Sequence, residues 1–354
     1  MVNASRNIWI GKMESESKLL IKNIYKIFGD RPEAVLKLVT DGINKQTLLE
    51  QHNHVLALNN INLEVSTGKF QVVMGLSGSG KSTLIRHVNR LIEPTAGSIF
   101  FNDDDVTNLD SKQLRQFRRF KTSMVFQNFA LLPHRTVLEN ISYGLEIQKQ
   151  EEKVLMDRSL EWLNRVGLDG YNDYYPTQLS GGMQQRVGLA RALATDAEIL
   201  LMDEPFSALD PLIREEMQDV LINLQNELKK TIMFITHDLD EALRIGDKVA
   251  ILKDGEIIQN GSPEEIILNP ANEYVTDFTK NINRGRILTI GAIIEDAVLE
   301  NAIKIDKKIT LEAALRAINE EGSQFANVVD NSRVIGSVSQ KTIINAITSG
   351  TEVN

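Results

Sequence analysis

The sequence predicts an α/β protein built on a mainly parallel sheet, and three observations lead to this fold class. Short apolar runs of strand length alternate with helical patterns through most of the chain. One of these runs, 70–74, leads into a glycine-rich loop that is followed directly by a helical pattern. After residue 282 a second, smaller alternation of strands and helices closes the chain, which predicts a separate α+β unit.

The composition is that of a globular protein with more than one domain. The chain has 354 residues, of which 42% are hydrophobic and 25% charged. A net charge of −9 argues against a nucleic-acid partner, because nucleic-acid binders usually present a basic face. The lack of cysteine excludes disulfides and cysteine-based metal or redox sites. No apolar run approaches the about 20 residues of a spanning helix, and residues 1–18 lack the apolar core of a signal peptide, so we expect a cytoplasmic protein.

The elements of the larger part follow from hydrophobic period and turn residues. Strands are expected at 19–25, 56–65, 70–74, 198–202, 231–236, 248–252 and 256–259. Helical patterns are expected at 31–53, 81–92, 111–191 and 218–228. The turn Asp254-Gly255 makes the last two strands a hairpin, and Ser262 with Glu265 has the pattern of a capping box.

These elements divide the chain into three predicted segments. Residues 1–18 form an N-terminal extension and residues 283–354 a small C-terminal domain. The main domain covers 19–282, with a helical insert at 31–53 and a helical subdomain at about 111–191.

The glycine-rich loop matches the P-loop pattern in full and lies between a strand and a helix, as that pattern requires. Glycines let backbone N–H groups turn inward around phosphate oxygens, where a side chain would collide. The helix that begins near Lys81 directs its positive end at the same anion. We expect Lys81 to reach the β- and γ-phosphates and the Ser82 hydroxyl to bind Mg²⁺. The residues expected to bind ATP or GTP are Gly75, Leu76, Ser77, Gly78, Ser79, Gly80, Lys81, Ser82 and Thr83.

Two adjacent carboxylates end the apolar strand at 198–202. Asp203 is expected to hold Mg²⁺ through a water, and Glu204 to polarise the attacking water as a general base. The strand at 231–236 leads directly to a histidine, His237. We interpret the remaining histidines as structural: His52, His54, His87 and His134.

A second glycine motif, Leu179-Ser180-Gly181-Gly182-Met183-Gln184-Gln185, opens another helical pattern and offers a second phosphate-facing loop. With the P-loop, the acidic pair, the segment Ser207-Ala208-Leu209-Asp210 and His237, it resembles the ABC ATPase superfamily, whose motifs occur in this order. Met183 stands inside the usual LSGGQ run. The resemblance covers roughly residues 19–282 and implies a P-loop fold with a RecA-like parallel-sheet core, an antiparallel β subdomain and a helical signature subdomain.

The resemblance also implies roles for individual residues. It places His237 against the γ-phosphate, and Gln127 against Mg²⁺ or water, from where Gln127 reports the nucleotide state to a membrane partner. It makes Phe28 the aromatic that stacks on adenine, with Tyr25 as the other candidate. It identifies Leu179–Gln185 as the signature loop and Ser207–Asp210 as the D-loop. Nucleotide contacts from these two loops are implied for Ser180, Gly181, Gly182, Gln184 and Asp210.

In such proteins two copies pair head to tail, and ATP with Mg²⁺ lies between the P-loop of one copy and the signature loop of the other. The resemblance therefore implies an ATPase that forms a homodimer on integral membrane permease subunits. It places the chain at the cytoplasmic face of the inner (plasma) membrane, as a peripheral subunit without nucleic-acid partners.

Several segments narrow the resemblance to the ATPase subunits of glycine betaine/proline uptake systems. They are Gly75-Leu76-Ser77, where most relatives have proline in place of leucine, the insert at 31–53, and 89–95, 124–134, 208–214 and 241–247. That family imports osmoprotectants, chiefly quaternary amines, which a substrate-binding protein delivers to the permease. An ATPase of another importer or of an exporter remains the alternative, followed by a non-transport ABC ATPase. Two features argue against a non-transport ABC ATPase. The chain has one cassette, whereas translation types carry two, and Gly75 and Ser180 are too close in the sequence for the long coiled coil of repair and chromosome types.

The C-terminal domain resembles a regulatory CBS domain. Its βαββα-like pattern is clear at about 309–350, with a weaker lead-in at 286–306. Because CBS units generally work in pairs, either two subunits pair their tails or this tail is a structural remnant. The sequence leaves open whether the unit responds to ionic strength or to an adenine nucleotide.

Overall fold

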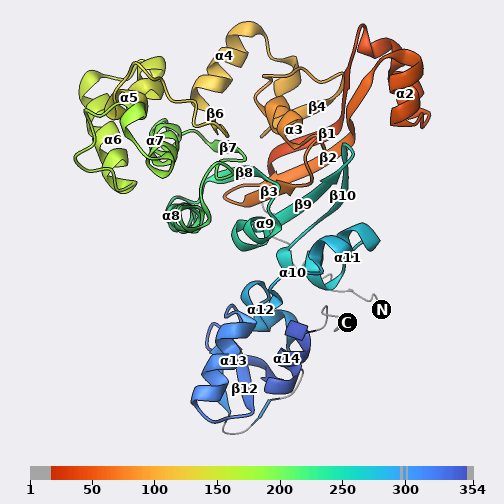
Figure 1. Cartoon of the computed structure of the whole chain (residues 1–354), viewed down its shortest axis with the longest axis vertical. Helices are drawn as coiled ribbons and strands as arrows, with labels where there is room; N and C mark the ends of the chain where they lie inside the picture. Colours follow the sequence, from red (N-terminus) through yellow and green to blue (C-terminus); the bar gives the residue numbers. More distant parts are fainter. Residues whose placement is uncertain (1–16, 296–297, 300–301, 349–354) are drawn as a thin grey trace, which may run out of the picture.

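The computed structural model describes residues 17–295, 298–299 and 302–348. The extension predicted at 1–18 lies outside the described residues except for its last two, which open a strand. The described part contains a four-stranded, a six-stranded and a three-stranded sheet. The C-terminal unit lies below the two larger sheets, and a group of helices lies to one side of them (Figure 1). Among the described helices, none combines the length and apolar character needed to cross a membrane.

The six-stranded sheet has the order β10-β9-β3-β8-β7-β6, and all neighbouring strands except the β9–β10 hairpin are parallel. Its strands are β3 (Phe70–Met74), β6 (Thr122–Val125), β7 (Ile199–Asp203), β8 (Thr231–Thr236), β9 (Lys248–Lys253) and β10 (Glu256–Gly261). Every residue of β3, β7 and β8 is buried, because other elements cover both faces. Alternate residues of β3 enter different cores: Val72 and Met74 pack in one, and Val73 in the other.

The four-stranded sheet is antiparallel, with the order β2-β1-β4-β5. Its strands are β1 (Ser17–Phe28), β2 (Val55–Ser66), β4 (Ala96–Phe101) and β5 (Asp104–Asp105). The helical insert between β1 and β2 is present as η1 (Pro32–Val35), α1 (Leu36–Thr40) and α2 (Lys45–His52). Val39 and Leu48 of the insert pack on Ile27 and Leu56 in a small core of their own. The predicted insert therefore folds back onto the strands that flank it.

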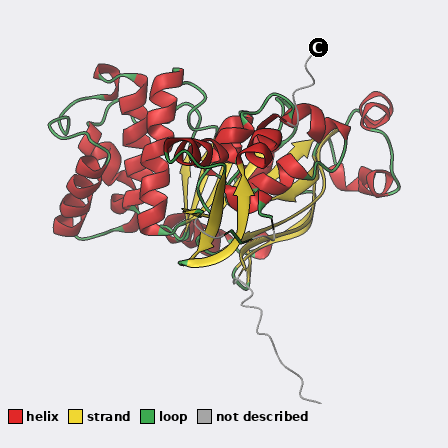
Figure 2. Cartoon of the chain, turned by 90° about the horizontal axis from the view of Figure 1, so that it is seen from below, coloured by secondary structure: helices red, strands yellow, loops and turns green. Residues whose placement is uncertain are grey.

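The helices of the main domain surround the sheets. They are η2 (Val106–Asn108), α3 (Lys81–Val88), α4 (Ser111–Phe120), α5 (Val137–Gln148), α6 (Glu152–Arg165), η3 (Pro176–Gln178), α7 (Gly181–Ala194), α8 (Pro211–Leu228), α9 (Leu239–Ile245), α10 (Pro263–Leu268) and α11 (Glu273–Thr279). Helices α5, α6 and α7 form a bundle outside the sheet, beyond β6 (Figures 1 and 2). Leu145, Trp162 and Leu189 of this bundle share one core with the central sheet. The capping box predicted at Ser262 is present at the start of α10.

Three parts of the structure differ from the sequence prediction. The helix predicted at 81–92 ends at Val88, because Arg90 takes a left-handed conformation and donates hydrogen bonds to the Val106 and Leu109 carbonyl oxygens. The stretch at 111–191, predicted to be mostly helical, contains the strand β6, which pairs with β7. The sequence also predicted neither β4 nor β5.

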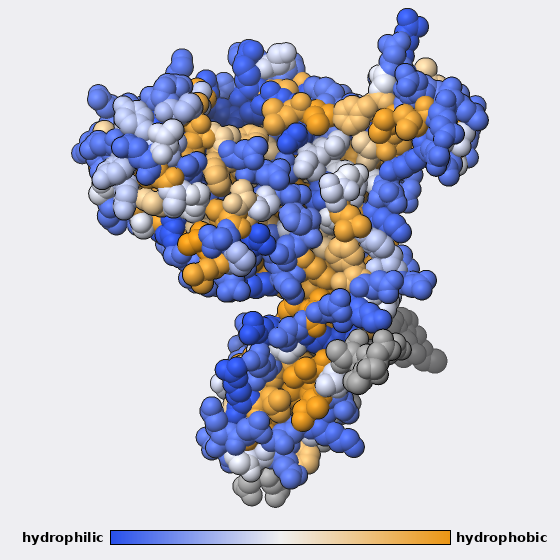
Figure 3. Space-filling view, viewed as in Figure 1, coloured by the Kyte–Doolittle hydropathy of each residue, from blue (hydrophilic) through white to orange (hydrophobic). Residues whose placement is uncertain are grey.

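The C-terminal unit has the predicted βαββα order. Its elements are β11 (Ile303–Asp306), α13 (Leu311–Glu320), β12 (Phe325–Asp330), β13 (Arg333–Ser339) and α14 (Gln340–Thr348), preceded by α12 (Arg284–Ile287) and η4 (Ile290–Ile293). It joins the main body through a narrow waist (Figure 3). The main core continues through this waist, from Ile266 and Val275 to Leu288 and then to Leu311 and Ile318. The two parts are therefore joined by packed side chains as well as by the chain. The tail predicted to extend to 354 lies outside the described residues after Thr348.

Candidate active site

The P-loop connects β3 to α3 and is pressed against neighbouring strands. A Cβ on Gly75 would lie 2.1 Å from the Leu252 carbonyl oxygen of β9, and a Cβ on Gly80 2.7 Å from the Ala57 carbonyl oxygen of β2. Gly78 and Gly80 have φ angles of +78° and +105°, which suit glycine. The loop therefore leaves no room for a side chain at Gly75 or Gly80, and it presents its backbone at the start of α3, where N–H groups without helical partners attract anions.

The side chain of Lys81 lies inside this loop and is only 4% exposed. Its Nζ donates hydrogen bonds to the carbonyl oxygens of Gly75 at 2.8 Å and Leu76 at 3.0 Å. The same nitrogen is 3.6 Å from a carboxylate oxygen of Glu204. A single ammonium group thus connects the loop to the acidic end of β7.

Ser82 and Asp203 meet beside the loop. The Ser82 hydroxyl donates to Oδ1 of Asp203 at 2.8 Å, and Asp203 is 2% exposed. Arg86, one helical turn after Ser82, donates to Oδ2 of Asp203 at 3.1 Å. Among the described residues, no group of three or more His, Cys, Asp or Glu side chains could hold a metal ion. A hydroxyl and one carboxylate fit Mg²⁺, which binds proteins through one or two oxygen ligands and takes further oxygens from phosphates and water.

Glu204, His237 and Gln127 converge on one point although they are far apart in the sequence. His237 Nδ1 lies 3.0 Å from Oε2 of Glu204, and Gln127 Nε2 lies 3.5 Å from the same oxygen. Each residue follows the carboxyl end of a strand, and β6, β7 and β8 are neighbours in the sheet. Glu204 has a φ angle of +46°, and its backbone N–H donates to the Ile235 carbonyl oxygen at 3.0 Å. The turn after β7 thus holds this carboxylate at the edge of the sheet, beside the P-loop lysine.

The signature loop lies elsewhere in the chain. Ser180 caps α7 by accepting a hydrogen bond from Met183 N, and the Gln184 side chain donates to the Leu179 carbonyl oxygen. A Cβ on Gly182 would lie 2.5 Å from the Ile213 side chain, so the loop packs on the start of α8. Among the described residues, the hydrogen bonds of Ser180 and Gln184 stay within the loop and do not reach the P-loop.

Asp210 and the two aromatic candidates occupy different surroundings. Asp210 is exposed and caps α8 by accepting from Ile213 N at 3.1 Å. Phe28 is 42% exposed at the end of β1, with Lys26 Nζ 4.8 Å from its ring centroid. Tyr25 instead packs against the core of the helical insert. Of the two aromatic side chains, Phe28 therefore has the larger free face.

Sequence reasoning missed two arginines at this site. Arg86 pairs with Asp203, and its spacing of four residues from Ser82 on one helix was the available signal. Arg214 donates to Asp238, the residue after His237, at 3.2 Å. No sequence pattern pointed to that contact, because it depends on the packing of α8 against α9.

Known proteins match the chain along most of its length. The family described as ABC transporter matches residues 58–207. The glycine betaine transport ATP-binding protein OpuAA of Bacillus subtilis is 52% identical over 294 residues, which cover 83% of this chain and 70% of that protein. The glycine betaine/proline betaine transport system ATP-binding protein ProV of Escherichia coli is 44% identical, over 94% of this chain and 83% of that protein.

Other matches extend the comparison to further relatives and to solved structures. The trimethylamine N-oxide transport system ATP-binding protein TmoW of Pelagibacter ubique is 44% identical, over 94% of this chain and 98% of that protein. A dimeric structure of the ATP-binding cassette MJ0796, in a post-hydrolysis state bound to ADP and Pi, superposes with a TM-score of 0.58 at 34% identity. It covers 69% of this chain and 98% of that cassette. The predicted fold class is confirmed, and the chain belongs to the ATP-binding subunits of ABC transporters, ATPases coupled to transport, in the branch that includes glycine betaine uptake systems.

Proposed function

We propose that this chain contributes one half of each of two ATP sites in a homodimer that drives the import of small methylated amines. The observation that carries the proposal is the convergence of Gln127 and His237 on one carboxylate oxygen of Glu204, beside Lys81. Ser180 and Gln184 of the signature loop instead make their side-chain hydrogen bonds within that loop. Within the described residues, one chain therefore offers the groups that bind ATP and those that hydrolyse it, but no second loop over the same phosphates.

In this proposal, the P-loop residues bind the phosphates of ATP. The backbone N–H groups of residues 75–83 hold the phosphate oxygens, and Lys81 exchanges its carbonyl partners for β- and γ-phosphate oxygens. Phe28 stacks on the adenine ring. When Mg²⁺ is bound, Ser82 and Asp203 hold it, with Gln127 nearby, and the ion neutralises charge that develops on the phosphates.

The hydrolytic roles fall to Glu204 and His237. The Glu204 carboxylate accepts a proton from the attacking water, and Lys81 Nζ lies 3.6 Å from that carboxylate. His237 contacts the γ-phosphate through Nε2, because its Nδ1 faces Glu204. Gln127 is exposed and lies after the edge strand β6, so it can transmit the state of the site toward the helical bundle.

The second loop over the phosphates comes from the other subunit. Ser180, Gly181, Gly182 and Gln184 of one copy cover the nucleotide in the P-loop of its partner, and Asp210 lies at the same interface. The dimeric state named for the cassette MJ0796 supports this arrangement. ATP binding closes the dimer and hydrolysis releases it, and that cycle moves the membrane permease subunits.

Glycine betaine, proline betaine or a related quaternary amine is the proposed cargo. This assignment rests on relatives that are 44–52% identical over most of the chain and whose names state glycine betaine transport. The chain acts at the cytoplasmic face of the inner membrane, and a substrate-binding protein delivers the solute from the other side. The C-terminal CBS-like unit is proposed to be regulatory, since a continuous core joins it to the ATPase domain.

Replacing Glu204 with glutamine tests the hydrolytic assignment. Glu204→Gln should reduce ATP turnover at least about a hundredfold and should leave ATP-bound dimers that persist in size-exclusion chromatography. The exposed Glu273 on α11 provides the control, and Glu273→Gln should behave like the wild type. Unchanged turnover in Glu204→Gln would remove Glu204 from its proposed role.

The cargo is tested by uptake. Cells that lack this chain should lose the accumulation of radiolabelled glycine betaine at high osmolarity and regain it with the wild-type gene but not with Glu204→Gln. Proline, carnitine and trimethylamine N-oxide measured in parallel would identify the preferred solute. Undiminished uptake of all four would contradict the proposed cargo class.

A further inference from the structure

Arg214 lies between the Leu209–Asp210 segment and the turn that carries His237, and both belong to the proposed ATP site. It stands one turn into α8, four residues after the helix cap Asp210. One end of its guanidinium donates to Oδ2 of Asp238 at 3.2 Å, and the other donates to the Leu209 carbonyl oxygen at 3.3 Å. A single rigid fork therefore connects the segment before Asp210 with the residue after His237.

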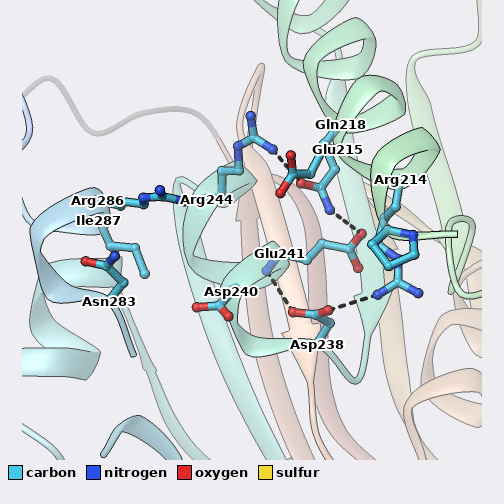
Figure 4. A pocket seen from close by; sticks show the side chains of 11 residues that line it. Arg214, Glu215, Gln218, Asp238, Asp240, Glu241, Arg244, Asn283, Arg286 and Ile287 are labelled. Carbon is cyan, nitrogen blue, oxygen red and sulfur yellow. Dashed lines mark hydrogen bonds and ion pairs between the residues drawn. The ribbon is translucent and has the colours of Figure 1, made fainter. Parts of the chain in front are cut away.

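Asp238 stabilises the turn that follows β8, where His237 lies. Its Oδ1 accepts from Glu241 N at 3.1 Å and caps α9, and its own N–H donates to the Thr236 hydroxyl at 3.0 Å. Its remaining oxygen is the one that receives Arg214 (Figure 4). Every hydrogen-bonding group of this aspartate side chain thus serves to fix the turn that carries His237.

His237 depends on that turn for its position. Its side chain is 51% exposed, and its hydrogen bond in the described structure is the one from Nδ1 to Glu204. An exposed ring with one partner is held mainly by its backbone. A change in the Arg214–Asp238 pair therefore moves His237 relative to Glu204 before it affects the P-loop.

A small polar cavity lies behind the same residues. Its volume is about 10 Å³, close to the space one water needs. Arg214 Nε is buried and has no hydrogen-bond partner within the described residues, so a water in this cavity would satisfy it. The polar side chains that line the cavity are Glu204, Ser207, Arg214, Thr236, His237, Asp238 and Glu241.

A larger pocket of about 440 Å³ opens on the other side of Arg214, between α8, α9 and α12 (Figure 4). A second arginine, Arg244, lies in the same pocket but donates to Gln218 at 2.8 Å and Asp219 at 2.7 Å. Neither partner belongs to the proposed site. The chain therefore supplies its own comparison: Arg214 and Arg244 each donate to two residues, but of these two arginines only Arg214 bonds to the His237 turn.

We infer that Arg214 is a positioning residue for ATP hydrolysis, which holds the His237 turn in register with the Leu209–Asp210 segment at the proposed subunit interface. The inference rests on the proposed function of Glu204 and His237. It concerns the hydrolytic step alone, because the fork touches neither the P-loop nor Phe28. The pair thus gives a mechanical link between the interface and the group that contacts the γ-phosphate.

Steady-state ATP hydrolysis by the full chain tests this role. Arg214→Gln should lower kcat about tenfold or more, the loss expected when a charge-assisted hydrogen bond that positions a reacting group is removed, while KM for ATP changes less than about twofold. Arg214→Lys keeps the charge but not the fork, and its kcat should lie between those of Arg214→Gln and the wild type. Arg244→Gln should keep the wild-type kcat.

A second variant separates positioning from folding. Asp238→Asn keeps an N-cap side chain for α9 but removes the charge that faces Arg214, so it should fold normally and lower kcat about threefold or more. The double variant with Arg214→Gln should lose no more than Arg214→Gln alone, since both changes break one interaction. Additive losses, a wild-type kcat in Arg214→Gln or Asp238→Asn, or an equal loss in Arg244→Gln would each overturn the inference. Failure of the proposed function is recognised separately, because Glu204→Gln would then retain turnover.

Discussion

A buried histidine makes the helix that follows the P-loop sensitive to acid. His87 is fully buried in α3, and its Nδ1 lies 2.6 Å from the Thr83 carbonyl oxygen. Its Nε2 is buried without a hydrogen-bond partner among the described residues. Burial lowers the pKa of His87 from 6.5 to about 4, although the Thr83 carbonyl acts in the opposite direction, and the charge of Lys26 lowers it further.

The direction and size of the change in unfolding free energy with pH follow from these two pKa values. In the unfolded chain His87 binds a proton below about pH 6.5, whereas in the folded protein it does so only below about pH 4. The contribution of His87 to the free energy of unfolding is therefore fully present above pH 6.5 and is lost progressively as the pH falls from 6.5 to about 4. The loss reaches about 2 kcal/mol at pH 5 and about 3 kcal/mol below pH 4, at 1.36 kcal/mol for each pKa unit.

Urea unfolding of the full chain at pH 7.5 and pH 5 measures this loss. His87→Gln cannot titrate, so its stability should fall less between the two pH values than that of the wild type, by about 2 kcal/mol. Other groups titrate equally in both proteins and cancel in the comparison. The exposed His134 supplies the control, and His134→Gln should keep the wild-type pH dependence. Equal pH dependence of His87→Gln and the wild type would refute the reasoning.

Two further predictions concern the nucleotide site. Gly80→Ala places a Cβ 2.7 Å from the Ala57 carbonyl oxygen at a φ angle of +105°. It should lower the free energy of unfolding, measured by urea titration, by about 2–4 kcal/mol. It should also weaken ATP binding, measured by the fluorescence of a labelled nucleotide. Phe28→Ala should raise KM for ATP several-fold without changing the melting temperature, whereas Tyr25→Ala, in the core of the insert, should lower the melting temperature and leave KM unchanged. The reverse pattern would make Tyr25 the adenine partner.

Buried strands and glycine motifs were the parts of this fold that sequence patterns predict well. The boundaries of β3 and β8 agree with the prediction, because continuous apolar runs end at a glycine or at a polar segment. The edge strand β6 was missed, since Thr122-Ser123-Met124-Val125 mixes polar and apolar residues and is only half-buried. Its pairing with β7 is a tertiary contact that no local pattern encodes.

The site was predictable in content but not in geometry. The sequence motifs identified Gln127, Glu204 and His237 as site residues. That these side chains lie close together depends on β6, β7 and β8 being neighbours in the sheet. The contact between Arg214 and Asp238 had no sequence signal for the same reason: it joins two helices that pack together only in the folded chain. Motifs therefore identify residue types, and the sheet order decides which of them act together.

Complementation between two inactive variants tests the central claim most directly. Lys81→Ala removes the P-loop ammonium group, and Ser180→Arg fills the signature loop, so each variant alone should lose ATP hydrolysis. Mixed in equal amounts, they form heterodimers with one intact site, made from the P-loop of the Ser180→Arg chain and the signature loop of the Lys81→Ala chain. The mixture should recover about a quarter of the wild-type rate if dimers form at random and the two sites act independently. If the mixture stayed as inactive as its components, the claim that each ATP site is shared between two subunits would be contradicted.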